Sequence, residues 1–382
     1  MKLLTKASFS DAVTKREQDN LQVAYRAACE SIVMLKNDGA LPFTTKKVAL
    51  YGPGVSMTIK GGTGSGEVNE RHSVTILEGM EDRGFTVTTK NWISRFEKHY
   101  QEQLAAYKEE KKKRVNLLKM DSIMSMLFDN FRFPDGPKIS VEDIQGSDTD
   151  SCIYVLSRQA GEGGDRKVEA GDFLLTDGEK KTIRYLAEKY SKFVLAVNCG
   201  SAIDTGFLDE IPGINAVLYI CQLGTEGGHA FADVISGAVS PSGKLPLTFY
   251  HDVNDLPEFT DYNMTNRTYR YYTGKPLYPF GYGLSYTNFE YRGLKLSTDS
   301  IAPGESVKAY VTVANTGSVA GTAVPQLYLR DWVSSTVKPL RYLCGFARVD
   351  LEPGEEKCVE IVIGPNSMRT LNEDYVWNID LV

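Results

Sequence analysis

Short apolar runs alternate with amphipathic segments through the first half of the chain. Apolar residues recur at helical spacing from Asp11 to Leu35, which predicts one helix ending at Asn37-Asp38-Gly39. Five apolar runs predict buried strands, at 48–51, 85–88, 152–156, 193–197 and 216–221. Further helices are predicted between them, at 73–83, 176–190 and 229–236. This alternation predicts a doubly wound, layered α/β sandwich domain.

A long polar segment interrupts that alternation. Residues 92–130 are rich in Glu, Lys, Leu and Met, and Phe131–Pro137 ends the helical pattern. We therefore predict a helical insertion at about 92–137. Its apolar ends, Leu117-Leu118 and Met124–Phe128, suit packing either on a neighbouring domain or on the insertion's own domain.

The pattern changes after Ser240. A segment rich in Tyr, Pro and Gly predicts an extended connector, and alternating runs at 307–314, 324–329 and 358–363 then predict a small antiparallel β-sandwich. The predicted domains are an α/β domain over 1–250, a connector over 251–288 and a β-sandwich over 289–382.

Composition narrows the class of protein. A hydrophobic content of 42% and a charged content of 24% are ordinary for a globular protein, and a net charge of -6 argues against nucleic-acid binding. No window approaches the roughly 18 apolar residues of a membrane span, and the first residues lack a signal-peptide core. The six cysteines are scattered, which favours free thiols in a reducing compartment, so we expect a cytoplasmic protein. Its four dispersed histidines indicate no metal site.

One acidic residue stands out as candidate chemistry. The stretch R-Q-A-G-E-G-G-D-R, Arg158–Arg166, follows an apolar strand and places Glu162 between glycines. Active residues of layered α/β domains lie in loops beyond the carboxyl ends of strands, which makes Glu162 a candidate for a working acid. The alternative is a solvated turn in which Asp165 pairs with Arg166.

A second loop, G-G-T-G-S-G from Gly61 to Gly66, follows the first strand of the domain. Glycine-rich loops can bind phosphate, but the spacing fits neither a P-loop nor a dinucleotide fingerprint. A structural or sugar-facing loop is the favoured interpretation.

Several long motifs occur in a specific order along nearly the whole chain. Together they resemble the family 3 glycoside hydrolases of β-glucosidase type, and Asn315–Leu329 resembles the fibronectin-type-III-like domain that many members carry. The motifs are A-A-C-E-S-I-V-M-L-K-N-D-G-A-L-P-F (Ala27–Phe43), K-G-G-T-G-S-G-E-V-N (Lys60–Asn69), G-E-G-G-D-R (Gly161–Arg166), S-G-K-L-P-L-T-F (Ser242–Phe249) and Y-P-F-G-Y-G-L-S-Y-T-N-F (Tyr278–Phe289).

The resemblance implies a role for each candidate residue. In that family a (β/α)8 barrel supplies an aspartate nucleophile and the α/β domain supplies the acid/base glutamate, whose position Glu162 matches. Gly164 stands where a larger residue is expected. The residues expected near substrate are Gly61, Gly62, Thr63, Gly64, Asp165 and Arg166. The substrate implied is a β-glucoside or an oligosaccharide, and no metal or organic cofactor is needed.

No barrel is found in these 382 residues. The chain begins at Met1 directly before the α/β domain, as in permuted members, and ends at Val376–Val382 before a closing strand of the sandwich. We therefore expect a truncated part of a permuted enzyme, without its nucleophile and inactive unless a barrel is supplied in cis or in trans. The alternative is a non-catalytic carbohydrate-binding or scaffolding protein. A homo-oligomer is compatible with the sequence.

Overall fold

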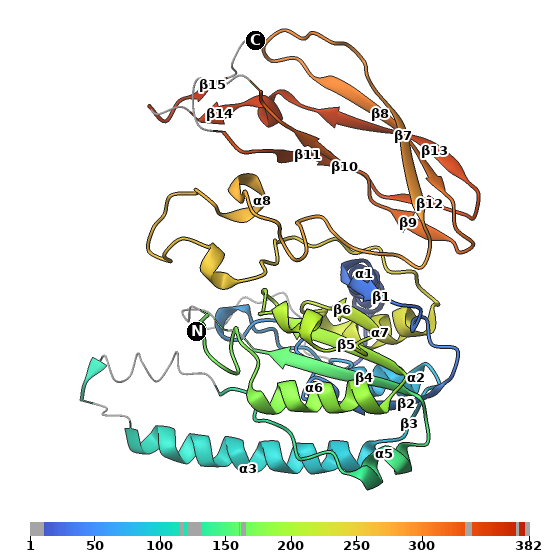
Figure 1. Cartoon of the computed structure of the whole chain (residues 1–382), viewed down its shortest axis with the longest axis vertical. Coiled ribbons are helices and arrows are strands. Elements are labelled where there is room, and N and C mark those ends of the chain that lie inside the picture. Colours follow the sequence, from blue (N-terminus) through green and yellow to red (C-terminus); the bar gives the residue numbers. More distant parts are fainter. Residues whose placement is uncertain are drawn as a thin grey trace.

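The protein consists of a layered α/β body, an extended connector and a set of antiparallel strands (Figure 1). The computed structural model describes residues 11–114, 118–120, 131–159, 161, 166–332, 338–371 and 374–378. This architecture confirms the predicted fold class.

The α/β body is built on a mixed six-stranded sheet with the strand order β1-β6-β5-β4-β2-β3. Strands β2 to β6 are parallel, and β1 runs antiparallel to β6. All eight residues of β4 are buried, as expected for a central parallel strand covered on both faces. The bounds are β1 Val33–Asn37, β2 Lys47–Tyr51, β3 Thr86–Val87, β4 Ser151–Arg158, β5 Lys192–Cys199 and β6 Ala216–Tyr219.

Helices cover the two faces of this sheet. Helices α1 and α2 both pack against α7, and α6 lies on the opposite side of the sheet from α1 and α7 (Figure 1). The bounds are α1 Lys15–Ser31, α2 Ile76–Asp82, α3 Lys90–Arg114, α5 Val141–Ser147, α6 Asp177–Lys189, α7 Gly227–Ser236 and α8 Thr268–Tyr271.

The helix predicted from Asp11 to Leu35 is too long. Helix α1 ends at Ser31, and Ile32 has an extended backbone that leads into β1. The run Val33–Leu35 is buried and pairs with β6, so it has no solvent-facing side. A short apolar run fits a buried strand as well as a helix, and here pairing with β6 decides between them.

Other predicted elements need smaller corrections. Helix α2 starts at Ile76 rather than at 73, because the Thr75 side chain caps the helix there. The predicted strand 193–197 is longer in the structure, where β5 runs from Lys192 to Cys199. The predicted strand 324–329 is shorter in the structure, where only Gln326–Leu329 forms β10, and Pro325 before it has no N–H to donate to a sheet.

The insertion is helical at its start, as predicted, and α3 projects from the body (Figure 1). Trp92 and Phe96 are buried, and Trp92 packs edge-on against Tyr51 of β2, with ring centroids 5.2 Å apart. Of the apolar ends, Leu118 is 95% exposed. Leu117 and Met124–Phe128 lie outside the described residues, so their packing stays a prediction.

The C-terminal strands form four small antiparallel sheets around a second apolar core. The largest has the order β13-β8-β7. The predicted domain boundaries stay predictions. The connector tyrosines Tyr278, Tyr282 and Tyr286 pack on the α/β core. The bounds are β7 Phe289–Leu296, β8 Val307–Asn315, β9 Gly321–Ala323, β10 Gln326–Leu329, β11 Tyr342–Phe346, β12 Val349–Leu351, β13 Glu356–Ile363, β14 Thr370–Leu371 and β15 Trp377–Asn378.

The six cysteines are free thiols; Cys29, Cys152 and Cys199 are buried, whereas Cys358 is exposed. None of the described helices combines the length and the apolar character required to cross a membrane.

Helices α2 and α7 approach each other through glycines. A Cβ atom added to Gly228 would lie 1.9 Å from the carbonyl oxygen of Thr75, and one added to Gly79 would lie 2.0 Å from the carbonyl carbon of Gly228. Neither distance is tolerated by real side chains, so the packing of these two helices requires glycine at both positions.

We predict that Gly228→Ala lowers the free energy of unfolding by about 1–3 kcal/mol, the usual cost of overpacking. Gly146→Ala is the matched control, because an added Cβ there meets no atom within 4 Å. In helix α5 that change should raise stability by about 0.5–1 kcal/mol. Urea denaturation measures both, and equal effects of the two substitutions would contradict the packing argument.

His229 of α7 pairs with two acidic residues, one of which belongs to α2. Its Nδ1 lies 2.7 Å from Glu226 Oε2, and its Nε2 lies 2.9 Å from Asp82 Oδ2 at the end of α2. Partial burial and the nearby Arg83 act to lower the pKa of His229, but the two hydrogen bonds outweigh them and raise that pKa above its usual value. The folded protein therefore holds this proton more tightly than the unfolded chain does.

The contribution of His229 to stability should be complete below about pH 6.5, the pKa in the unfolded chain, and disappear as the pH rises through the raised pKa. Unfolding free energies measured from pH 5.5 to 8.5 should show this decline in the parent protein and lose it in His229→Gln. His99→Gln is the control, since His99 makes no ion pair with a described residue. An unchanged pH profile in His229→Gln would be the contrary result.

Candidate functional site at the carboxyl edge of the sheet

The parallel strands β2, β4, β5 and β6 end at one edge of the sheet, and the loops that follow them meet there. Buried Asn198 of β5 joins two of these loops. Its Oδ1 accepts a hydrogen bond from Ile59 N at 2.7 Å, and its Nδ2 donates to Ile59 O at 3.0 Å and to Cys221 O at 2.8 Å. The start of the glycine-rich loop is therefore fixed by the neighbouring strand.

The glycine-rich loop lies beside the segment that precedes Glu162. Thr63 forms a parallel bridge with Gly161, and Gln159 Nε2 donates to Gly61 O at 3.2 Å. The predicted substrate-proximal residues Gly61, Gly62 and Thr63 thus reach the end of β4, and Gly64 begins the short 3-10 helix Gly64–Gly66. Two motifs almost 100 residues apart in sequence meet at this edge.

A hollow of about 350 Å³ opens next to that contact. Its lining includes Gly61, Gly62 and Thr63 together with four residues that sequence analysis did not identify, Lys60, Glu70, Phe133 and Gln159. Lys60 and Gln159 lie inside the stretches Lys60–Asn69 and Arg158–Arg166 quoted above, so the sequence indicated their neighbourhood though not their individual roles. Phe133 comes from the insertion, and nothing in its local sequence indicates that it returns to this edge.

Three charged residues line the hollow, Lys60, Glu67 and Glu70. The side chains of Lys60 and Glu70 make an ion pair, and the hydrogen bond from Lys60 lowers the pKa of Glu70 below its usual value. Glu70 is therefore ionised at neutral pH. Its Oε2 is buried and has no hydrogen-bond partner among the described residues.

Glu162 and Asp165 lie outside the described residues, so the acid/base role of Glu162 and the substrate contact of Asp165 stay predictions. The residues on either side are described. Gly161 pairs with Thr63, and Arg166 donates from Nε to the Asp172 carboxylate, from Nη2 to Asp172 O at 2.8 Å and from Nη1 to Ser201 Oγ. Both ends of the candidate loop are thus held at the carboxyl edge.

A buried ion pair holds the end of β4, next to the candidate loop, in place. Arg158, the last residue of β4, donates from Nη1 and Nη2 to the two carboxylate oxygens of Glu179, each at 2.7 Å. Only 5% of Arg158 and 8% of Glu179 is exposed. Burial acts to lower the pKa of Arg158, but its hydrogen bonds and charge interaction with Glu179 raise that pKa above its usual value. Arg158 Nε also donates to Asp172 O at 2.8 Å.

Two families match consecutive parts of the chain. Residues 32–286 match the glycosyl hydrolase family 3 C-terminal domain, and residues 323–380 match the fibronectin type III-like domain. The first match contains the glycine-rich loop, the Glu162 segment and the buried ion pair.

Curated relatives and solved structures agree with these matches. The chain is 30% identical to beta-glucosidase A of Butyrivibrio fibrisolvens, covering 93% of this chain and 47% of that protein. It is 33% identical to a beta-glucosidase of Ruminococcus albus, covering 92% and 37%. It is similar to beta-glucosidase 3B from Thermotoga neapolitana in complex with alpha-D-glucose, with a TM-score of 0.74, 31% identity and coverage of 94% and 50%. The chain therefore spans half or less of the length of these proteins.

The buried ion pair predicts a specific pattern of stability. Arg158→Met should lower the free energy of unfolding by about 3–5 kcal/mol, because it leaves the Glu179 charge buried without a partner. Arg158→Met combined with Glu179→Met should recover most of that loss. Urea denaturation of the single and double variants tests this.

Arg184→Met is the control for removal of an arginine, since its pair with Glu210 is 3.4 Å long and both side chains are largely exposed. Its effect should stay within about 0.5 kcal/mol. Equal losses of unfolding free energy in Arg158→Met and Arg184→Met would show that the buried ion pair stabilises the protein no more than an exposed one does.

Proposed function

This chain belongs to glycosyl hydrolase family 3, and from that membership we propose that it is the acid/base-bearing part of a retaining β-glycosidase acting on terminal β-linked sugars. The observation that supports this most directly is the bridge between Thr63 and Gly161. It places the glycine-rich loop, a hollow and the start of the Glu162 segment at one edge of the sheet.

The proposed chemistry uses two carboxyl groups. Glu162 protonates the glycosidic oxygen as the bond breaks, and its carboxylate then takes a proton from the water that releases the sugar. The nucleophile that attacks the anomeric carbon is an aspartate on a (β/α)8 barrel outside these 382 residues. In retaining enzymes the two groups lie about 5–5.5 Å apart, so the barrel must dock against this edge of the sheet.

The described residues have supporting roles in this proposal. Arg166 is bound to Asp172 after the candidate loop, and Gly161 pairs with Thr63 before it, so the described residues on both sides of the loop are held in place. The hollow beside them has the polar groups of Lys60 and Gln159 and the apolar ring of Phe133 in its lining. That combination suits the hydroxyl groups and apolar face of a sugar at the leaving-group side.

β-Glucosides are the proposed substrates, because the curated relatives described above carry the name beta-glucosidase. Binding of a carbohydrate without hydrolysis is the second candidate function. The hollow beside the glycine-rich loop supports this second function, because a sugar bound in it would need no contact with a second domain.

The chain alone should not hydrolyse an aryl β-glucoside, whereas the chain fused to a family 3 barrel should. In the fusion, Glu162→Gln should lower kcat/KM by about 100-fold or more on alkyl glucosides, because general acid catalysis contributes typically 10²–10⁴-fold. Its effect on 4-nitrophenyl glucoside, whose leaving group needs little protonation, should be much smaller. Release of 4-nitrophenol and of glucose measures the two rates.

Glu142→Gln is the matched control, since Glu142 lies exposed in the first turn of α5 and should not affect either substrate. Equal losses on both substrates in Glu162→Gln would argue against its role as the acid. Strong hydrolysis by the chain alone would overturn the assignment of the nucleophile to a barrel. Binding of a glucoside that no fusion hydrolyses would favour the second candidate function.

A further inference from the structure

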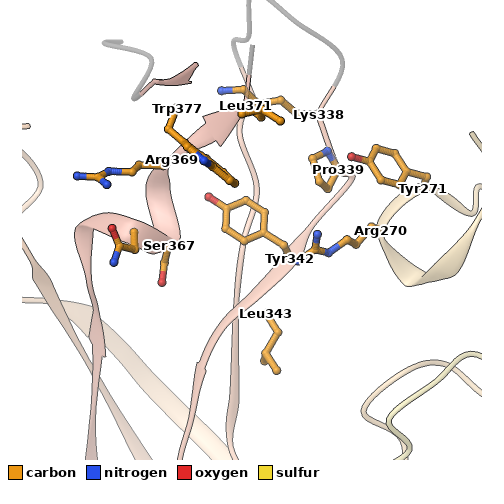
Figure 2. Close-up of a pocket in the computed structure, with 11 residues that line it drawn as sticks. Arg270, Tyr271, Lys338, Pro339, Tyr342, Leu343, Ser367, Arg369, Leu371 and Trp377 are labelled. Atoms are coloured by element: carbon orange, nitrogen blue, oxygen red, sulfur yellow. The ribbon is translucent and has the colours of Figure 1, made fainter. Parts of the chain in front are cut away.

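A second cavity lies far from the carboxyl edge, between helix α8 of the connector and strands of the C-terminal sandwich. It has a volume of about 420 Å³ (Figure 2). Neither family match nor the proposed hydrolysis gives it a role. Its lining includes Arg270, Lys338, Tyr342, Arg369 and Trp377.

The charge of this lining is entirely positive among the described residues. Arg270, Lys338 and Arg369 are cations, and no described Asp or Glu lines the cavity. Lys338 is paired with Asp331, but the guanidinium groups of Arg270 and Arg369 make no ion pair or hydrogen bond with a described residue. Two guanidinium groups without carboxylate partners, in a protein of net charge -6, point to an anionic ligand.

Aromatic rings lie between these cations. In Figure 2 the rings of Tyr342 and Trp377 lie between Arg369 on one side and Arg270 on the other. Tyr342 is half-buried and Trp377 is 63% exposed, so the indole ring has a free apolar surface. Flat apolar surfaces beside cations suit a ring that carries a negative charge, whereas a simple inorganic anion would contact the cations alone.

The backbone of Arg270 is held in place by contacts with the C-terminal strands. Leu340 N donates to Arg270 O at 2.7 Å, and Leu343 N donates to the hydroxyl oxygen of Tyr269 at 3.0 Å. The ring of Tyr269 is also stacked on Phe280, with centroids 4.2 Å apart. These contacts hold α8 against β11, so a ligand need not order that side of the cavity.

We propose that this cavity binds a small molecule in which a carboxylate is attached to a ring. Arg270 binds the carboxylate, Arg369 adds positive charge on the other side of the rings, and Tyr342 and Trp377 contact the face of the ligand's ring. A planar guanidinium binds a carboxylate through two parallel hydrogen bonds, which gives the orientation as well as the affinity. Two sources supply this chemistry, a sugar acid and an aromatic acid. The site does not depend on the hydrolase function proposed above.

The test uses the 382-residue chain with four probes in two matched pairs, glucuronate with glucose and benzoate with benzyl alcohol. The chain has three tryptophans, so the ¹⁵N indole signal of Trp377 is a local reporter that Trp377→Phe assigns. We expect glucuronate, benzoate or both to shift that signal, and neither neutral partner to do so. A shift of the Trp377 signal with glucuronate alone would identify the ligand as a sugar acid. A shift with benzoate alone would identify it as an aromatic acid.

The double variant Arg270→Gln with Arg369→Gln should weaken that binding by at least about tenfold, the effect of losing one charge-assisted hydrogen bond. Arg16→Gln with Arg26→Gln is the control, because it removes the same charge from two exposed arginines of α1 and should leave binding unchanged. Melting temperatures verify that both double variants fold.

Three results would overturn the proposal. These are no shift of the Trp377 signal with either carboxylate, equal shifts with the neutral partners, and binding that the arginine double variant leaves intact. Competition by inorganic phosphate as strong as that by the ring carboxylates would also overturn it, because the rings would then contribute nothing.

Discussion

The ion pair of Arg158 and Glu179 is the constraint on which the carboxyl edge depends. Two charges removed from water are tolerated only while each faces its partner, so the end of β4 and the start of α6 have one relative position. Glu179 also accepts a hydrogen bond from Thr176 N at 2.8 Å, which makes the same carboxylate part of the helix cap. Through Asp172 O, Arg158 extends this order to the segment that follows the candidate acid loop.

Much of the α/β body is predictable from sequence, because buried parallel strands are continuous apolar runs with clear limits. Strand β4 and helix α6 follow such signals, an apolar run in one case and a capping box in the other. The end of α1 is not predictable in this way, since Val33–Leu35 fits two structures until its partner β6 is known. The order of apolar and polar residues around Val33–Leu35 contains no information about which strand this run pairs with.

The candidate site shows the same limit. Family motifs indicate the glycine-rich loop and Glu162 separately, but their adjacency follows from the pairing of β2 with β4, which only the three-dimensional sheet order establishes. The presence of Phe133 at this edge is even harder to predict from sequence, because it depends on how a polar insertion folds back after α3. The cationic cavity joins residues from the connector with residues 67–107 positions later in the sequence, and neither group stands out alone.

The distribution of tryptophans has a practical consequence. Trp92 is 2% exposed and lies between Tyr51 and Phe96 in the α/β body, whereas Trp332 and Trp377 belong to the sandwich region and are 78% and 63% exposed. Fluorescence from a buried indole lies at shorter wavelength than fluorescence from an indole in water. The short-wavelength part of the emission spectrum therefore comes from Trp92 in the α/β body. A red shift of that emission on heating reports melting of this body.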